Sequence, residues 1–191
     1  DEIIALVQLE EKRKARVGTL SGGQKQRLSV ACALAGDPDL IFLDEPTTGL
    51  DPQSRRQLWD LVDRLRAMGR TIMLTTHYMD EAERLCDRLV VMDKAKIVAE
   101  GSPRELIEQY STREVLELRF PDAVRAGLDG RLTGIGDRVE MLPDRAQIYT
   151  TDGESALQQV DACGIPIESA VVRRSTLEDV FLRLTGRGLV E

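Results

Sequence analysis

Apolar residues recur along the chain with two alternating periods, and this alternation predicts a layered α/β fold. Spacings of three and four residues predict helices from Ser21 to Gly36 and from Asp51 to Gly69. Between them, the short apolar run 40–43 is typical of a strand covered on both faces, and 71–76 predicts a second strand. Strands and helices in alternation favour a parallel sheet with helices packed against it.

The pattern changes near residue 110, and we place a domain boundary there, between residues 1–110 and 111–191. Before it, strands are expected at 89–92 and 97–99, followed by a helix capped by Ser102. After it, the expected order is β-α-β-β-α-β, which is typical of a small ferredoxin-like α+β domain. The six expected elements lie at 115–120, 124–128, 139–142, 146–150, 155–163 and 167–172, and a last helix ends at Gly186.

Composition narrows the possible functions. The formal net charge is −7 and no basic face is evident, which argues against a nucleic-acid partner. The three cysteines form no C-x-x-C pair, so we expect small core residues in a reducing compartment. No apolar run reaches membrane-spanning length. The chain begins with Asp1 rather than Met, which suggests a piece of a longer protein.

Polar side chains follow the two predicted parallel strands. Asp44 and Glu45 come directly after the first strand, and His77, the only histidine, comes after the second. Ligands of parallel sheets gather at the carboxyl ends of strands. There Asp44 could hold Mg²⁺ and Glu45 could polarise a water that attacks a phosphate. This interpretation requires Glu45 and His77 to be close in space; the alternative is a charged strand end and a structural histidine.

A second candidate site lies at the start of the first helix. Ser21 and Gln24 have the spacing of a capping box, with Gly22 and Gly23 between them. Free N–H groups and small side chains at a helix start suit a phosphate. The alternative is a glycine-containing cap without a ligand.

Together these motifs resemble the nucleotide-binding domain of ABC transporters over roughly the first 110 residues. Leu20–Gln24 matches the LSGGQ signature and Ile41–Glu45 the Walker B strand. Gly49–Asp51 matches the D-loop and His77 the switch histidine, in the family's order. The resemblance implies a partial P-loop NTPase sheet that binds ATP and Mg²⁺.

The resemblance also implies partners and residue roles. Two such domains pair head to tail, as a homodimer or heterodimer, and a transmembrane permease uses the ATPase cycle for transport. Ser21, Gly22, Gly23 and Gln24 would contact the ATP of the partner subunit. Asp44, Glu45 and His77 would act on the subunit's own ATP, with Asp44 at the metal, and Asp51 would couple the two sites. The protein would be cytoplasmic, peripheral on the inner face of the membrane.

Two further segments, 76–83 and 177–182, resemble bacterial exporter ATPases of the drug- and antibiotic-resistance type, which often carry a small C-terminal domain. This resemblance implies an exporter of the multidrug or antibiotic-resistance type. The ATPase half of such machines does not usually contact the cargo, so the exported molecule stays open.

One expected motif is missing, because the chain has no Gly-Lys dipeptide and hence no G-x-x-x-x-G-K-[ST] loop. We therefore expect the full-length parent to be an ATPase, but the chain alone to be inactive and to expose an apolar gap in its sheet. The alternative is a non-catalytic regulatory or interaction module that lends its signature to a complete partner. A chromosome-maintenance ATPase is less favoured, since no sustained heptads are present.

Overall fold

The computed structural model describes residues 1–121 and 128–186 and divides the chain into two compact units, Asp1–Leu85 and Cys86–Glu191. The boundary predicted at residue 110 lies inside the second unit, and it remains a prediction about domain organisation. Of the helix expected over 124–128, residues 124–127 lie outside the described part; a short helix, α6, covers Leu128–Leu132.

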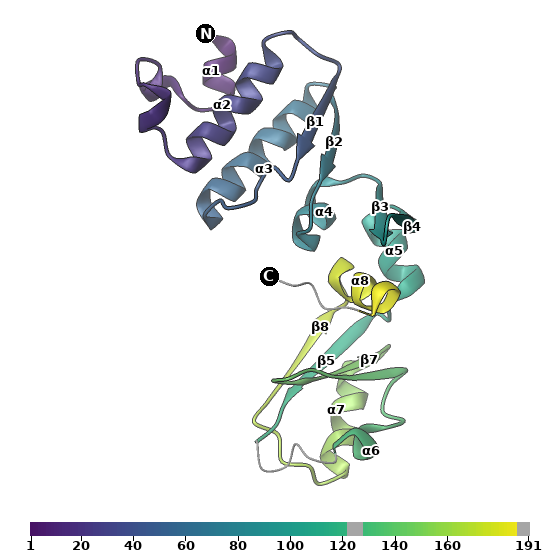
Figure 1. Ribbon diagram of the computed structural model, residues 1–191. Helices are drawn as coiled ribbons and strands as arrows, with labels where there is room; N and C mark the ends of the chain where they lie inside the picture. Colours follow the sequence, from purple (N-terminus) through teal and green to yellow (C-terminus); the bar gives the residue numbers. More distant parts are fainter. Residues whose placement is uncertain (122–127, 187–191) are drawn as a thin grey trace. The chain divides into compact units, whose positions relative to one another are not determined.

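The first unit is built from a two-stranded parallel sheet and the helices packed against it (Figure 1). Its regular elements are the helices α1 (Glu2–Leu6), α2 (Gly22–Leu34), α3 (Pro52–Ala67) and α4 (Met79–Leu85), and the strands β1 (Leu40–Asp44) and β2 (Thr71–Thr75). Two short 3₁₀ turns, Glu10–Lys12 and Val17–Thr19, join α1 to α2. Both long helices start where capping residues predicted them, at Ser21 and Asp51.

The sheet of the first unit is buried on one face only. Ile41 and Leu43 of β1 pack into a core with α2 and α3. Leu40, Phe42 and Met73 line the opposite face and remain 45%, 68% and 58% exposed. The prediction that 40–43 is covered on both faces is therefore wrong for this chain, whereas the expected apolar gap is present. A run that is apolar on both sides is suited to a strand with a packing layer on each face. In this chain, α2 and α3 pack against the same face of the strand, and the opposite face is left exposed.

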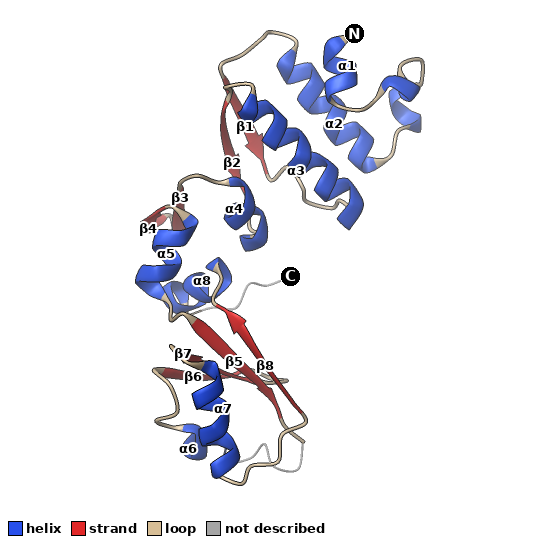
Figure 2. Cartoon of the chain, turned by 180° about the vertical axis from the view of Figure 1, so that it is seen from behind, coloured by secondary structure: helices blue, strands red, loops and turns tan. Residues whose placement is uncertain are grey.

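The second unit contains a hairpin with its helix and a four-stranded antiparallel sheet (Figure 2). The hairpin pairs β3 (Leu89–Asp93) with β4 (Lys96–Gly101), and α5 (Pro103–Tyr110) follows. The sheet has the order β6-β7-β5-β8, with β5 (Glu114–Arg119), β6 (Arg138–Met141), β7 (Ala146–Thr150) and β8 (Ser169–Arg174). Its helices besides α6 are α7 (Gly153–Ala162) and α8 (Leu177–Thr185). This element order and strand order confirm the ferredoxin-like prediction.

One detail differs from the sequence interpretation and another agrees with it. Cys32 and Cys163 are exposed and only Cys86 is partly buried, so the cysteines are not core residues. Gly186 has φ +65° and ends α8 as predicted, because a left-handed residue at this position costs glycine little. Among the described residues, no helix is long and apolar enough to cross a membrane.

Candidate nucleotide site

The parallel pairing of β1 with β2 brings the predicted acidic residues and the histidine to one edge of the sheet. Asp44 is the last residue of β1 and pairs in register with Thr75, the last residue of β2. Glu45 directly follows the end of β1, and His77 lies two residues after the end of β2. The placement at the carboxyl ends of neighbouring strands, expected from the sequence, is confirmed.

The Thr75 hydroxyl organises both carboxylate residues. Its Oγ1 donates a hydrogen bond to Asp44 Oδ1 and accepts one from the Glu45 backbone N–H at 3.1 Å. The same N–H also lies 3.0 Å from the Thr75 carbonyl oxygen. Sequence reasoning assigned Thr75 no role; a hydroxyl residue ending an otherwise apolar strand was the available signal. Thr75 therefore positions the groups proposed to hold the metal and to polarise water.

Glu45 adopts an uncommon backbone conformation that sets the direction of its side chain. Its φ is +42°, in the left-handed region that side chains other than glycine rarely adopt. Such conformations cost about 1–3 kcal/mol and persist where the surrounding contacts hold them. Here the two contacts with Thr75 and the sharp turn into the buried Pro46 hold the chain.

The Glu45 carboxylate faces His77. Glu45 Oε1 lies 3.5 Å from His77 Nδ1, and Oε2 accepts a hydrogen bond from Thr48 Oγ1 at 3.2 Å. Both side chains are about half exposed, at 50% for Glu45 and 46% for His77. The imidazole also lies against the ring of Tyr78, with centroids 4.2 Å apart. The two residues thus form a pair that is accessible to solvent.

The signature segment forms the predicted capping box at the start of α2. Gln24 N–H donates to Ser21 Oγ at 3.3 Å, and Ser21 N–H donates to Gln24 Oε1 at 3.0 Å. Gly22 is exposed and has nothing within 4 Å of where a β-carbon would stand. The helix start is therefore accessible at Ser21 and Gly22, as an anion site requires.

Gly23 has a different role from its neighbour, because it is buried against α3. A β-carbon at Gly23 would lie 2.4 Å from Ser54 Oγ and 2.6 Å from Ser54 Cβ. No real side chain tolerates such distances, so glycine allows the starts of α2 and α3 to approach each other. This contact links the signature to the D-loop segment.

Asp51 acts as the N-cap of α3. Its Oδ1 accepts from the N–H groups of Gln53 and Ser54, and its Oδ2 accepts from Ser54 Oγ at 2.6 Å. The hydrogen bond from the Ser54 hydroxyl, followed by that from the Ser54 N–H, lowers the pKa of Asp51 below its ordinary value. The carboxylate is thus held ionised and in place by its own helix.

The candidate residues fall into two groups that share no contact described above. Asp44, Glu45 and His77 lie around Thr75, and Ser21–Gln24 lie with Asp51 around Ser54. Within the described ranges, no group of three or more His, Cys, Asp or Glu residues could hold a metal ion. Asp44 supplies one oxygen-ligand side chain, which fits Mg²⁺ because this ion usually takes one or two carboxylates, with phosphates and water completing its shell.

A second surface feature of this unit was not anticipated. Trp59 Nε1 donates to Glu81 Oε1 at 3.0 Å, and Glu81 is fully buried. The Arg55 guanidinium lies between aromatic rings, 5.3 Å from Trp59 and 5.6 Å from Tyr78. A surface cavity of about 310 Å³ adjoins them, lined by Arg56, Trp59, Asp60 and Arg84. These contacts tie α3 to α4 just after His77.

In the second unit, Arg173 belongs to a buried ionic network. Its guanidinium bonds Asp179 at 2.7 and 2.9 Å and Glu117 at 2.7 Å, and Tyr149 also donates to Asp179. Burial alone would raise the pKa of Asp179, but hydrogen bonds from Arg173 and from the Thr176 N–H hold it below its ordinary value. Arg173 is therefore a partner of two carboxylates rather than a solvated surface charge.

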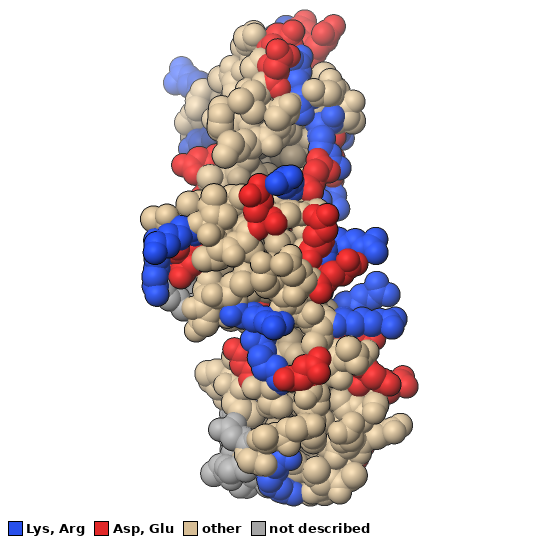
Figure 3. All heavy atoms as spheres, turned by 90° about the vertical axis from the view of Figure 1, so that its right-hand side faces the viewer, with Lys and Arg blue, Asp and Glu red and all other residues tan. Residues whose placement is uncertain are grey.

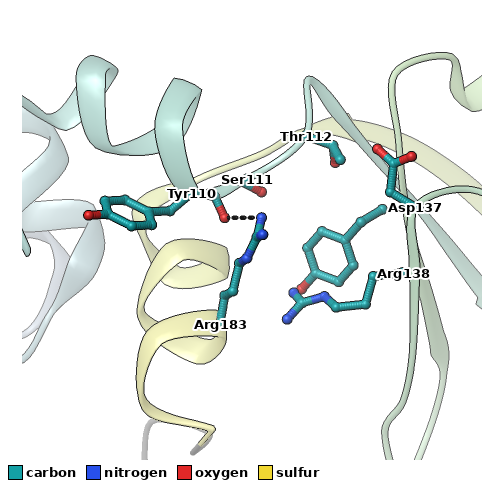
Figure 4. A pocket seen from close by; sticks show the side chains of 7 residues that line it. Tyr110, Ser111, Thr112, Asp137, Arg138 and Arg183 are labelled. Carbon is teal, nitrogen blue, oxygen red and sulfur yellow. Dashed lines mark hydrogen bonds between the residues drawn. The ribbon is translucent and has the colours of Figure 1, made fainter. Parts of the chain in front are cut away.

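A cavity of about 220 Å³ lies beside this network (Figure 4). Arg183 of α8 donates to the Tyr110 carbonyl at 2.8 Å, and the Arg138 guanidinium stacks 3.9 Å from the centre of the Tyr149 ring. The remaining lining residues are Ser111, Thr112 and Asp137. The hydroxyls of Ser111 and Thr112 are bonded to the Ser175 hydroxyl and to the Glu114 carbonyl. We therefore interpret the cavity as part of the packing between α5, α8 and the sheet.

Comparison with known proteins agrees with the geometry of the first unit. The family model described as "ABC transporter" matches residues 1–48, and the model "Nodulation factor export protein NodI, C-terminal domain" matches residues 125–186. Solved ATP-binding cassettes have a similar fold. One, from an ABC transporter in its ADP conformation, gives a TM-score of 0.53 at 31% identity over 57% of this chain and 43% of that one. The chain is part of an ABC transporter ATP-binding subunit.

Two curated relatives share one name. The Nod factor export ATP-binding protein I of Burkholderia orbicola is 45% identical over 97% of this chain and 60% of its own length. The protein of that name from Rhizobium sp. strain N33 shows the same identity and coverage. Structurally, cbiO1 from Clostridium perfringens, part of the transporter complex cbiONQ, gives a TM-score of 0.53 at 31% identity over 57% of this chain and 44% of its own. The chain spans about three fifths of the length of these curated relatives.

Proposed function

We propose that this chain is part of the ATP-hydrolysing subunit of an ABC exporter. It provides the residues that activate the attacking water and the signature segment of an ATP site shared between two subunits. The observation that carries the proposal is the Glu45–His77 pair at the carboxyl ends of β1 and β2. Two side chains distant in sequence meet there beside a carboxylate suited to Mg²⁺.

Each residue then has a distinct task. Asp44, oriented by the Thr75 hydroxyl, supplies a ligand for Mg²⁺, which neutralises developing charge on the phosphates. Glu45 orients and polarises the attacking water, and His77 hydrogen-bonds to the γ-phosphate. In a head-to-tail dimer, the exposed N–H group of Gly22 and the side chains of Ser21 and Gln24 approach the ATP of the other subunit, with Gly23 fixing their position.

The proposed partners follow from the family. They are a second ATPase subunit, identical or different, and a transmembrane permease that places the protein on the inner face of the membrane. Asp51 lies beside the signature through Ser54 and is suited to couple the two ATP sites. We further propose that residues 1–110 belong to the ATPase domain and residues 111–191 to an accessory domain, since the match to the NodI C-terminal model lies within the latter.

The exporter type expected from the sequence, that of drug and antibiotic resistance, has no support among the relatives reported above, which are named for Nod factor export. We propose a cargo of the Nod-factor class instead. A nucleic-acid partner remains disfavoured. On the face of the molecule shown in Figure 3, Lys and Arg side chains are interspersed with Asp and Glu, and the net charge is −7.

The test is Glu45→Gln in the longer protein that contains this chain, reconstituted with its permease. We expect ATP turnover to fall by about 10²–10³, as for loss of one transition-state contact, while ATP binding is kept. Asp63→Asn, at a partly exposed position of α3 that contacts Arg84 and none of the candidate residues, is the matched control and should keep full turnover. Unchanged turnover in Glu45→Gln would remove Glu45 from its proposed role.

The alternative is a non-catalytic module that lends its signature to a complete partner. It is favoured by one observation, the lack of a G-x-x-x-x-G-K-[ST] loop within these 191 residues. We expect the 191-residue chain alone to show no ATP turnover under either hypothesis. Only under the alternative would Glu45→Gln leave the reconstituted complex active, while Ser21→Arg, which blocks the signature, abolishes activity.

A further inference from the structure

Strand β8 forms an open edge of the four-stranded sheet. It pairs with β5 on one side, and no described strand pairs with its other side (Figures 1 and 2). Every residue of β8 except Arg173 is exposed, and Val171 and Val172 are 55% and 40% exposed. Edge strands with adjacent exposed valines are normally protected, because their free backbone groups and apolar side chains can pair with another chain.

The contact between β8 and β5 shows which backbone N–H and C=O groups of β8 point toward β5 and which point toward the open edge. Ser175 N–H donates to the Arg113 carbonyl, in line with the register that pairs Arg174 with Glu114. In an antiparallel ladder, backbone groups alternate between the two sides. Odd-numbered residues of β8 therefore bond to β5, and Ala170, Val172 and Arg174 direct their N–H and C=O groups to the open edge.

This alternation restricts how β8 could pair with a copy of itself. Only residues of equal parity can stand opposite each other, so a two-fold axis must pass through a residue. An axis at Val171 lets the strand pair over its length. It sets Val171 against Val171 of the copy, and Ala170 against Val172, so that the exposed apolar side chains cover one another.

The same register matches charges. It sets Arg174 opposite Glu168 of the copy, twice by symmetry. Both residues are exposed, and neither makes an ion pair with another described residue. Glu168 lies just before β8, and its N–H donates to the Arg119 carbonyl instead of following the alternation of the even-numbered residues. The regular ladder therefore ends at Ser169, and Glu168 contributes only its carboxylate, beside Arg174 of the copy. Opposite charges at the two ends of a short apolar strand make β8 complementary to itself.

We propose that β8 pairs antiparallel with β8 of a second copy, with the two-fold axis at Val171, and joins two four-stranded sheets into one. This contact goes beyond the proposed ATP-dependent head-to-tail dimer, because it involves no nucleotide-site residue and requires no nucleotide.

Cysteine cross-linking tests both the contact and its register. In the 191-residue chain with Cys32, Cys86 and Cys163 replaced by serine, Val171→Cys and Val172→Cys are oxidised mildly without nucleotide. Opposite residues at a non-hydrogen-bonded position have Cα atoms about 4.5 Å apart, within disulfide range. The two copies of residue 172 are diagonal to each other and beyond the roughly 7 Å limit. We expect a covalent dimer from Val171→Cys and little from Val172→Cys. No dimer, or equal yields at both positions, would overturn the proposal.

Charge exchange provides the second test, by light scattering at fixed protein concentration. Glu168→Arg should halve the mass by placing two cations opposite each other. Glu168→Arg combined with Arg174→Glu should restore the dimer, since each swapped residue again faces its opposite charge. A monomeric double variant, or a dimeric Glu168→Arg, contradicts the register. Circular dichroism spectra matching the parent confirm that the variants fold. Neither result depends on ATPase activity, so failure here leaves the proposed function standing.

Discussion

Gly23 and Ser54 approach so closely that a β-carbon on Gly23 would lie 2.4 Å from the Ser54 hydroxyl oxygen. The contact joins the first turn of α2 to the first turn of α3. Ser54 in turn bonds Asp51, so one small residue connects the signature with the D-loop. The second glycine of the signature thus has a packing role, distinct from the accessible Gly22.

Replacing Gly23 by alanine should therefore destabilise the chain by about 1–3 kcal/mol, the range for forcing extra volume into a packed site. Thermal or urea unfolding measures this. Gly22→Ala is the matched control and should be near neutral, since nothing lies within 4 Å of the added carbon. Ser54→Gly should recover part of the loss in Gly23→Ala. Equal effects at the two glycines would contradict the packing role.

Thr75→Val should disturb the proposed catalytic edge without disturbing the sheet. Valine keeps the shape of threonine but removes the hydroxyl that orients Asp44 and contacts Glu45 N–H. In the longer protein we expect Mg²⁺-dependent ATP turnover to fall about 10–100-fold, the usual effect of losing a partner of a metal ligand. Thr75→Ser keeps the hydroxyl and should stay active. A fully active Thr75→Val enzyme would show that the hydroxyl is dispensable.

Arg173→Met should strongly destabilise the second unit. It leaves Asp179, which is 1% exposed, without its guanidinium partner. Breaking such a buried pair costs about 3 kcal/mol or more. Chemical unfolding followed by Tyr149 fluorescence measures the loss. Arg113→Met, which removes an exposed guanidinium, should change stability by less than about 0.5 kcal/mol.

The same network predicts how stability depends on pH. The folded pKa values of Asp179 and Glu117 lie below their ordinary values of 3.8 and 4.5. For Glu117, burial opposes the shift, and hydrogen bonds from Arg173 and Gln147 outweigh it. Carboxylates with lowered folded pKa values stabilise the fold above their unfolded pKa, and this contribution is lost as the pH falls through the folded value. The melting temperature should therefore drop below about pH 4.5, and more steeply in the parent than in Arg173→Met. Parallel pH profiles would contradict this.

Phe42→Thr should leave the stability of the chain within about 0.5 kcal/mol of the parent, because Phe42 is 68% exposed. It should also reduce the binding of a hydrophobic dye and the self-association that exposed apolar patches promote. Leu43→Ala, one residue along β1 but 8% exposed, should cost about 2–4 kcal/mol. Large destabilisation by Phe42→Thr would mean that this face is covered in solution.

Local features of the sequence determined most of the elements. Capping residues at Ser21, Asp51 and Ser102 fixed three helix starts, since a cap satisfies backbone N–H groups within its own turn. The apolar runs located the strands, and their order was sufficient to predict the ferredoxin-like sheet. The motif order was sufficient to predict the family.

Contacts between distant segments required the tertiary structure. The 3.5 Å approach of Glu45 to His77 depends on the pairing of β1 with β2, and the Gly23–Ser54 contact depends on how α2 packs on α3. The ionic network of Arg173 joins residues of two strands and a helix that are far apart in the sequence. In the sequence alone, these residues therefore look like ordinary surface charges. Hydrophobic periodicity records which face of an element is apolar. It does not record which other element covers that face, because packing partners depend on shape and connectivity across the whole chain. For this reason the sequence alone could not show that Phe42 is exposed or that Glu45 lies beside His77.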